Sequence, residues 1–436
     1  MAARKNLPPF HWRRGVLHAE EIALPDLAER VGTPFYCYAA GALETAWHAM
    51  AEALERALPA HPKLICYSLK ANSNLALIRL FGREGAGADI VSGGELARAL
   101  KAKIPPRRIV FSGVGKTVEE MDAALAAGIH MFNVESPAEL ERLRGRAKAL
   151  ARRAPIALRL NPDIDARTHE KITTGRAENK FGMDGRTLHE LARRAHAAAE
   201  LDLVGLDLHI GSQIMTRAPF DAAFGALVQH ARALTSAGMP IARLDVGGGL
   251  GIAYDEPTRA PDWRGYAALL ARHVKGLPCQ LIFEPGRALV ARAGLLVGRV
   301  LEQKRNGRKQ FLIVDASMNE LMRPTLYDAD HHMEAVVRRR APAQPRRWDI
   351  VGPICESGDF LARGRRLSAP AAGELLAIFD VGAYGAALGS HYNSRPLAPE
   401  VLVQGDKFFL VRHRTALHKL WHNESVPPFL RARATR

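Results

Sequence analysis

The sequence has few cysteines and no pattern that would link them. Among 436 residues there are four, Cys37, Cys66, Cys279 and Cys355, and they form neither a CxxC pair nor a set at metal-ligand spacing. This argues against a disulfide framework and against a zinc site. We therefore expect no metal, and any cysteine with a function should act as a thiol.

Long apolar runs are also missing. No stretch approaches the ~18 apolar residues of a membrane span, and the N-terminal stretch MAARKNLPPFHWRRG lacks the apolar core of a secretory signal. A cytoplasmic protein without a membrane role is expected. A hydrophobic content of 47% can fill the core of two domains, or of one large barrel with an added module.

Acidic residues are outnumbered, 45 against 61 Lys and Arg, which gives a net charge of +16. Such a surplus can serve nucleic-acid binding. However, the basic residues are scattered, and the densest run, VRRRAPAQPRRW at 337–348, has no interleaved aromatics for base stacking. We expect a solvated Arg-rich surface, or attraction for acidic metabolites, rather than a nucleic-acid partner.

What the chain does have is a regular alternation of strand-like and helix-like segments. Short apolar runs followed by helical patterns recur eight times between residues 64 and 285. Helix signals lie between them, such as Ser136, Pro137 and Glu139 as a capping box and Gly128 as a helix end. This pattern predicts a (β/α)8 barrel. The runs are LICYSL at 64, ADIVS at 88, RIVFSG at 108, MFNVE at 131, IALRLN at 156, LVGLDLHIG at 203, RLDVGGG at 243 and CQLIFEPG at 279.

After Gly286 the pattern changes to strand-like pieces separated by turns, which predicts a β-rich second domain. The pieces are ALVARAGLLVGRVLEQKR, KQFLIVDAS, RRWDIVGP, ELLAIFD and KFFLVRH. Residues 1–35 contain an isolated strand candidate that could join it. We expect an N-terminal segment at 1–35 joined to the β domain, a barrel at 36–286 and a β-rich domain at 287–436.

Chemically active side chains fall where the barrel strands end. The C-terminal ends of the strands carry the active site in such barrels. Each residue also has an ordinary interpretation: the GGGLG glycines can be a tight turn, His209 a core histidine, and Glu284 a partner of Arg287. At these ends lie Lys70, Ser92, His209, Ser212, Gly247 to Gly249, Gly251, Glu284 and Arg287.

Taken together, these residues meet the needs of one cofactor, pyridoxal phosphate. Its aldehyde needs a lysine, for which Lys70 is the candidate. Its phosphate needs backbone amides, which glycine loops after strands seven and eight commonly supply in barrels. Its ring nitrogen needs a charged partner, and the Glu284 carboxylate would keep that nitrogen protonated.

Several motifs, in order along nearly the whole chain, resemble the diaminopimelate decarboxylase family, which belongs to the pyridoxal-phosphate enzymes with the alanine-racemase-like fold and the ornithine decarboxylase superfamily. They are SLKANSNLALIRL, GADIVSGGEL, FSGVGKT, LNPDIDARTHEKITTG, KFG, HIGSQI, DVGGGLG, EPGR, GPICESGDFLA and GAYGAALGSHYNSRP. The resemblance implies decarboxylation of meso-2,6-diaminopimelate to L-lysine by a homodimer.

The resemblance also implies roles at the matching positions. Lys70 would bind the cofactor aldehyde, His209 would stack on its ring and Glu284 would hold its nitrogen, while Ser212, Gly248, Gly249, Gly286, Arg287 and Tyr384 would complete the cofactor site. Arg287, Arg323, Tyr327 and Tyr384 would bind substrate. From the neighbouring subunit, Cys355 would act as general acid and Glu356 would bind the distal ammonium, so two copies would share each active site.

Three alternatives share parts of this pattern. A sister decarboxylase of D-lysine, D-ornithine or a carrier-linked amino acid would not need the carboxylate clamp of Arg323 and Tyr327. A racemase of this fold resembles its relatives in placing an arginine at the ring nitrogen, where this chain has Glu284. A catalytically inactive regulator would be expected to lose cofactor residues, yet Lys70, the glycine loop and Cys355 are all present.

Overall fold

The eight expected strand segments form one closed barrel of parallel strands in the computed structural model, which describes residues 9–166, 169–172, 174–176, 178–254, 260–339 and 344–430. Consecutive strands pair along the wall, and β12 pairs with β5 to close it. The predicted (β/α)8 barrel is confirmed. Its strands are β5 (Lys63–Ser68), β6 (Gly87–Ile90), β7 (Ile109–Phe111), β8 (Met131–Val134), β9 (Ala154–Leu160), β10 (Leu201–Leu208), β11 (Arg243–Asp245) and β12 (Gln280–Phe283).

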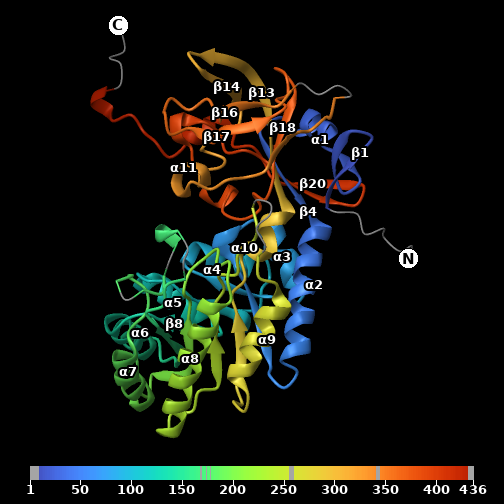
Figure 1. Cartoon of the computed structure of the whole chain (residues 1–436). Coiled ribbons are helices and arrows are strands. Elements are labelled where there is room, and N and C mark those ends of the chain that lie inside the picture. Colours follow the sequence, from blue (N-terminus) through green and yellow to red (C-terminus); the bar gives the residue numbers. More distant parts are fainter. Residues whose placement is uncertain are drawn as a thin grey trace.

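Helices follow each strand and form the outer layer. They are α3 (Leu75–Arg83), α4 (Gly93–Lys101), α5 (Val118–Ala127), α6 (Pro137–Ala149), α7 (Gly185–Ala197), α8 (Ala218–Ser236), α9 (Trp263–Val274) and the short α10 (Arg287–Val290). The long α2 (Ala40–Ala57) precedes β5 and packs against α9 and α3. It therefore takes the eighth outer position, and Figure 1 shows it running down the side of the barrel. No helix in the described ranges has both the length and the apolar character needed to cross a membrane.

The helix ends follow the expected capping chemistry with one difference. Gly128 ends α5 in the left-handed conformation, at φ 69°. Before α6, the Ser136 side chain accepts a hydrogen bond from the Glu139 backbone as expected. The Glu139 carboxylate, however, does not return to Ser136 to complete the box. It accepts from Lys116 Nζ at 2.7 Å and from the Glu135 backbone at 3.1 Å, because a buried ammonium is the stronger donor.

A β-rich second part stands above the barrel in Figure 1. Its main sheet has the order β17-β16-β14-β13-β4-β19-β20, with β18 paired to β13 and to β15. The expected β-rich second domain is thus confirmed, although the start of its first piece forms α10 instead of strand. The strands are β4 (Phe35–Ala39), β13 (Gly294–Asn306), β14 (Lys309–Val314), β15 (Met333–Ala335), β16 (Arg346–Val351), β17 (Phe360–Leu367), β18 (Leu375–Ile378), β19 (Glu400–Gln404) and β20 (Lys407–Arg412).

The strand β4, which begins at Phe35, joins this sheet. β4 pairs with β13 and β19, so residues through Ala39 belong to the second part, and we propose the domain boundary there instead of at 35. A separate small sheet precedes it, made of β1 (Phe10–Arg13), β2 (Val16–Ala19) and β3 (Ile22–Ala23) and followed by α1 (Leu24–Val31). Another short helix of the second part, α11, spans Arg323–Tyr327.

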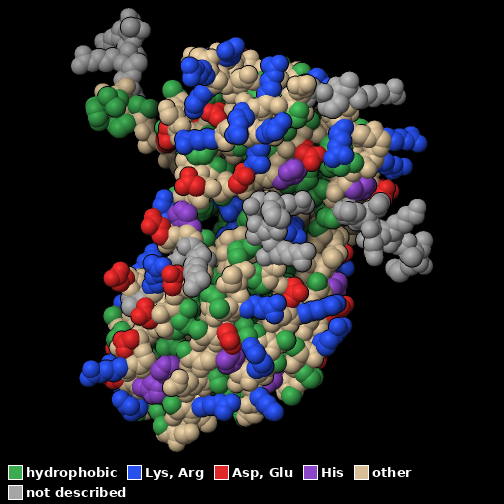
Figure 2. Space-filling view, viewed as in Figure 1, with side chains coloured by type: hydrophobic (Ala, Val, Ile, Leu, Met, Phe, Trp, Pro, Cys, Tyr) green, Lys and Arg blue, Asp and Glu red, His purple; other side chains and the backbone are tan. Residues whose placement is uncertain are grey.

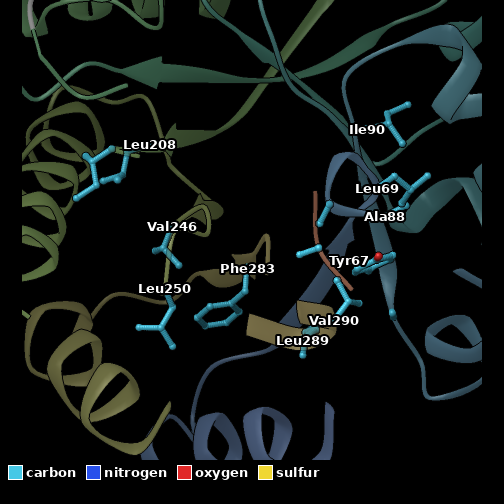
Figure 3. Packing of buried hydrophobic residues seen from close by; sticks show 14 of the residues in the cluster. Tyr67, Leu69, Ala88, Ile90, Leu208, Val246, Leu250, Phe283, Leu289 and Val290 are labelled. Carbon is cyan, nitrogen blue, oxygen red and sulfur yellow. The ribbon is translucent and has the colours of Figure 1, made fainter. Parts of the chain in front are cut away.

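The core is continuous from the barrel into the junction with the second part. Figure 3 shows Phe283 of β12 with Val246 and Leu250 on one side and Leu289 and Val290 of α10 on the other. The junction appears as an indentation between two lobes in Figure 2, which also shows Lys and Arg side chains crowding the upper lobe. Residues 340–343 of the basic run lie outside the described residues.

Candidate active site

A cavity of about 410 Å³ opens at the C-terminal ends of the barrel strands, beneath the second part. It gathers residues that lie far apart in the sequence, because parallel strands bring their ends to one rim. Nine of the thirteen residues to which the family resemblance assigns roles line it: Lys70, His209, Ser212, Gly248, Gly249, Glu284, Gly286, Arg287 and Tyr384. The other four of these, Arg323, Tyr327, Cys355 and Glu356, do not line it, whereas Gly247 of the strand-end candidates does.

Lys70 follows β5, and its side chain is 35% exposed, toward the cavity. Its ammonium lies 3.1 Å from Oδ2 of Asp89, at the end of β6. Burial by itself would lower the pKa of Lys70, but the charges of Asp89 and Glu284 outweigh it and raise that pKa above its ordinary value. Lys70 is thus a protonated amine held by a carboxylate within the pocket.

The second part reaches the lysine through the GAYG turn. The Tyr384 backbone amide donates to the Ala71 carbonyl at 2.8 Å, and Asn72 Nδ2 donates to the Gly382 carbonyl at 3.0 Å. Tyr384 has φ 55°, a left-handed conformation that is held by these packed neighbours. These bonds place the Tyr384 side chain on the cavity wall beside Lys70.

Glu284 follows β12, the strand that pairs with β5, and is 4% exposed. Its Oε1 accepts from Ser112 Oγ at 3.0 Å and from Asn133 Nδ2 at 3.4 Å. Burial first, and then the charge of Asp245, raises the pKa of Glu284 well above its ordinary value. No ion pair links Glu284 to Arg287 within the described ranges, so that ordinary interpretation of Glu284 does not hold. A carboxylate in this situation is stabilised by any cation that enters the pocket.

Behind Glu284, the barrel interior contains further carboxylates. Oxygens of Asp207, Asp245 and Glu284 lie within 4.8 Å of one another, and all three residues are buried. Asn133 Nδ2 also donates to Asp245 Oδ2 at 3.2 Å, and Arg159 Nε lies 3.6 Å from Asp207. The amide hydrogen bond holds Asp245 and the guanidinium balances the charge of Asp207, so we interpret the group as structural support for Glu284.

The glycine loops bring bare backbone to the cavity. A Cβ at Gly248 would collide with the Glu284 carbonyl, and one at Gly286 would lie 2.9 Å from Ala71 Cβ. Gly249 has φ +99°, which disfavours any other residue. Gly248 and Gly286 are therefore close-approach positions as well as turns. Beside them, Arg287 Nη2 donates to Ser212 Oγ at 3.0 Å, so a cation and a hydroxyl adjoin the glycine backbone, a combination that suits a phosphate.

His209 follows β10 and also borders the cavity, so it is not an interior core residue. Its Nδ1 accepts from the Gly248 backbone amide at 3.2 Å. Burial, followed by the charges of Lys70 and Arg159, lowers the pKa of His209 well below its ordinary value. The imidazole is neutral and its apolar ring can face a flat ligand.

Two arginines come together at the edge of the cavity although one belongs to the second part. Both are buried, Arg287 at 6% and Arg323 at 5% exposure. Their guanidinium carbons lie 5.9 Å and 4.4 Å from the centre of the Tyr254 ring. Among the described residues neither contacts a carboxylate, and the Nε of each has no partner. Buried guanidiniums without anions are a site for an anionic ligand.

The remaining expected residues lie apart from this pocket. Cys355 is exposed, and its backbone amide donates to Asn393 Oδ1 at 2.8 Å. Glu356 is its exposed neighbour. Tyr327, at the end of α11, has its ring 5.8 Å from that of His169. Thus Arg323 joins the pocket residues through Tyr254, whereas Cys355 and Glu356 are exposed and do not line their own chain's cavity.

Several site residues were not found from the sequence. Asp89, Ser112, Asn133 and Arg159 lie within strands or just after them, where alternation alone does not tell an inward side chain from an outward one. Lys180, which lines the cavity, follows the irregular stretch after β9. Tyr254 contacts Arg323 only because the two parts pack together, and both Tyr254 and His331 lie outside the regular helices and strands. The strand-end rule could have identified Ser112, which directly follows β7.

Comparisons with known proteins agree with this geometry. Residues 41–291 match the family model described as pyridoxal-dependent decarboxylase, pyridoxal binding domain. The chain is 45% identical, over 97% of its length and all of the relative's, to diaminopimelate decarboxylase of Zymomonas mobilis subsp. mobilis.

Two solved structures are similar to the whole fold. One is diaminopimelate decarboxylase from Helicobacter pylori complexed with L-lysine, with a TM-score of 0.87 and 40% identity, covering 92% of this chain and 99% of that one. The other is diaminopimelate decarboxylase from M. jannaschii in co-complex with L-lysine, with a TM-score of 0.92 and 35% identity, covering 97% and 98%.

Proposed function

Because this chain belongs to the diaminopimelate decarboxylase family, we propose that it converts meso-2,6-diaminopimelate to L-lysine and CO2, the last step of lysine biosynthesis, using pyridoxal 5'-phosphate in the cytoplasm. The family makes the chain a pyridoxal-dependent decarboxylase. The observation that carries the proposal is a pocket that holds Lys70 and Glu284 and adjoins two buried arginines, neither of which contacts a carboxylate among the described residues.

The cofactor roles follow from the chemistry of each wall. When bound, pyridoxal phosphate supplies an electron sink for the electrons left behind as CO2 departs. Lys70 offers the amine for attachment, and the neutral ring of His209 can cover one face. Glu284 would hold a proton at the ring nitrogen, because a positive nitrogen would stabilise a carboxylate whose pKa is raised by burial and by the charge of Asp245. Phosphate would bind the amides near Gly248, Gly249 and Gly286, with Ser212, Arg287 and Tyr384 beside them.

The substrate roles rest on charge. Arg287 and Arg323 can bind the distal carboxylate of the substrate, Arg323 with the geometry of a planar fork and Tyr327 with its hydroxyl. Ornithine and arginine have no distal carboxylate, so the same arginines would be left without anions. This favours diaminopimelate over the sister substrates D-lysine and D-ornithine. A racemase is disfavoured by the Glu284 carboxylate at the cofactor side of the pocket.

The proton donor would come from a second copy of the chain. Cys355 and Glu356 are exposed and lie outside the cavity of their own chain. In a homodimer with two-fold symmetry, each chain can deliver both residues to the other chain's pocket. There Cys355 would return a proton to the carbon that lost CO2, and Glu356 would bind the distal ammonium of the substrate.

The test is a substrate comparison on purified protein supplied with pyridoxal phosphate. CO2 release and L-lysine formation are measured with meso-diaminopimelate and, separately, with L-lysine, ornithine, arginine, D-lysine and D-ornithine. We expect release from meso-diaminopimelate alone. The Lys70→Ala variant is the control for uncatalysed release. Preferential release from a diamino acid without a distal carboxylate would reject the proposed substrate in favour of a sister decarboxylase.

A further inference from the structure

Arg323 has an unusual partner for a buried guanidinium. Its Nη1 lies 2.7 Å from Nε2 of His331, an imidazole that is fully buried. Arg323 opens α11, and His331 lies four residues beyond the end of that helix. Both side chains pack against Tyr254, a residue of the barrel. The Arg323 guanidinium carbon lies 4.4 Å from the centre of the Tyr254 ring, and the His331 ring meets that ring edge-on at 5.2 Å. A neutral heterocycle thus takes the place where an acidic side chain would usually bind an arginine.

The partner of His331 Nδ1 determines which of the two ring nitrogens carries the hydrogen. His331 Nδ1 lies 2.8 Å from the Phe379 backbone carbonyl, which can only accept. Nδ1 therefore carries the hydrogen, and Nε2 is left with a lone pair that accepts from Arg323 Nη1. Burial, and then the charge of Arg323, lowers the pKa of His331 to about 3, so this tautomer persists at neutral pH. The His331 backbone is itself held, because Arg365 Nη2 donates to its carbonyl at 2.9 Å.

We propose that His331 is a positioning residue that fixes the Arg323 guanidinium against Tyr254 and leaves its charge free for the substrate's distal carboxylate. An aspartate at this position would neutralise the guanidinium and compete with the carboxylate. An apolar residue would leave a buried donor unpaired. A neutral acceptor avoids both, because it orients one N–H and leaves the others and the full positive charge available. The inference rests on the proposed function and deepens it.

Tyr254 completes the arrangement from the barrel side. Its hydroxyl accepts from Arg287 Nη1 at 2.7 Å, while its ring faces Arg323. Arg287 is held in turn by Ser212. Among the described residues, the groups that orient the two guanidiniums are Ser212, Tyr254 and His331, and all three are uncharged. Preorientation lowers the entropic cost of binding a carboxylate, so its loss should weaken substrate binding more than it slows the reaction.

The test compares His331→Phe, which keeps a flat ring but removes the acceptor, with His331→Gln, whose amide oxygen can still accept. Two quantities are measured: kcat and KM for meso-diaminopimelate, and the dissociation constant of L-lysine in binding experiments without turnover. We expect His331→Phe to raise the KM and the lysine dissociation constant at least about tenfold, the cost of a hydrogen bond to a charged group. kcat should change by less than about threefold, and His331→Gln should recover most of the affinity.

A double-mutant cycle separates positioning from general damage. In an Arg323→Met background there is no guanidinium to orient, so adding His331→Phe should not weaken lysine binding further. The double variant also lacks the buried Arg323 charge, so no guanidinium donor is left unpaired by the loss of His331. Its lysine affinity can therefore be measured even if His331→Phe alone folds poorly. An additional loss of affinity in the double variant, or unchanged lysine affinity in His331→Phe, would overturn the inference. Failure of the proposed function would appear separately, as a wild-type protein that releases no CO2 from diaminopimelate.

Discussion

The ammonium of Lys70 lies 3.1 Å from Oδ2 of Asp89, and the same oxygen accepts a hydrogen bond from Ser68 at 2.6 Å. Asp89 is fully buried at the end of β6, where it cannot obtain a counter-charge from solvent. The carboxylate therefore favours the charged form of Lys70. Attack on an aldehyde requires the neutral amine, so if Lys70 binds the cofactor as proposed, Asp89 would slow its attachment.

The first prediction concerns the pH dependence of that attachment. Because the pKa of Lys70 is raised, the neutral fraction is small at neutral pH and grows as pH rises. The rate of covalent attachment in cofactor-stripped wild-type protein should therefore increase with pH across the neutral range. Asp89→Asn removes the charge that does most to raise the pKa and should speed attachment at a given neutral pH. Stopped-flow absorbance after mixing with pyridoxal phosphate measures the rate.

Ser68→Ala is the matched control for this prediction. It removes a hydrogen bond to Asp89 Oδ2 but leaves the carboxylate, so its attachment rate should stay near that of the wild type. An Asp89→Asn protein that attaches cofactor no faster than wild type at the same pH would contradict the electrostatic account.

A second prediction identifies the attachment site, since two lysines, Lys70 and Lys180, line the cavity. Lys70→Ala should lose the visible absorption of the lysine-linked cofactor, and borohydride should leave no stable adduct. Lys180→Ala should keep both, because only Lys70 ends a barrel strand. Mass spectrometry of the reduced protein after proteolysis locates the modified residue. A stable adduct on Lys180 in the wild type would reject the assignment of Lys70.

The third prediction concerns Glu284. Its substitution by Gln keeps an oxygen for Ser112 and Asn133 but cannot hold a proton at the ring nitrogen. Turnover should fall by about 100-fold or more, as expected for loss of a preorganised charge, while the dissociation constant of the cofactor changes little. Steady-state kinetics and cofactor titration measure the two effects. Asp245→Asn, one layer further from the pocket, should have the smaller effect on kcat. Near-normal turnover of Glu284→Gln would mean that another group protonates the ring.

The barrel could be predicted from the sequence because its signals are local. Each of the eight strands is an apolar run of the right length, and the parallel order follows from the intervening helices. In the second part the signals are weaker. β19, within PEVLVQ, was not expected, and the stretch beginning ALVARAG starts as α10 because the Gly286 turn leads into a helix at Arg287.

The site divides in the same way. Lys70, Glu284 and the glycine loops could be found because the strand-end rule applies to them directly. The contacts of Arg323 could not. It meets Tyr254 only through the packing of the second part on the barrel, and it meets His331 through an irregular turn after α11 that no periodic pattern predicts. The predicted capping box before α6, of which only the Ser136 half forms, also depended on a contact that the local pattern does not contain. The pattern at Ser136 is correct, yet Lys116, which approaches from the preceding strand-end loop, binds the Glu139 carboxylate.

The fourth prediction tests the shared active site. Lys70→Ala and Cys355→Ala should each be nearly inactive. If Cys355 and Glu356 serve the partner's pocket, a heterodimer of the two variants has one site with both defects and one with neither. Random exchange of equal amounts makes half of the dimers heterodimers, so the mixture should recover about a quarter of wild-type activity per site.

If Cys355 instead served its own chain, every site would carry one defect. Activity that stays at the level of the separate variants, after exchange is verified by native mass spectrometry, would reject the intersubunit role and leave the decarboxylase assignment standing. Mixing each variant with itself controls for effects of the exchange procedure.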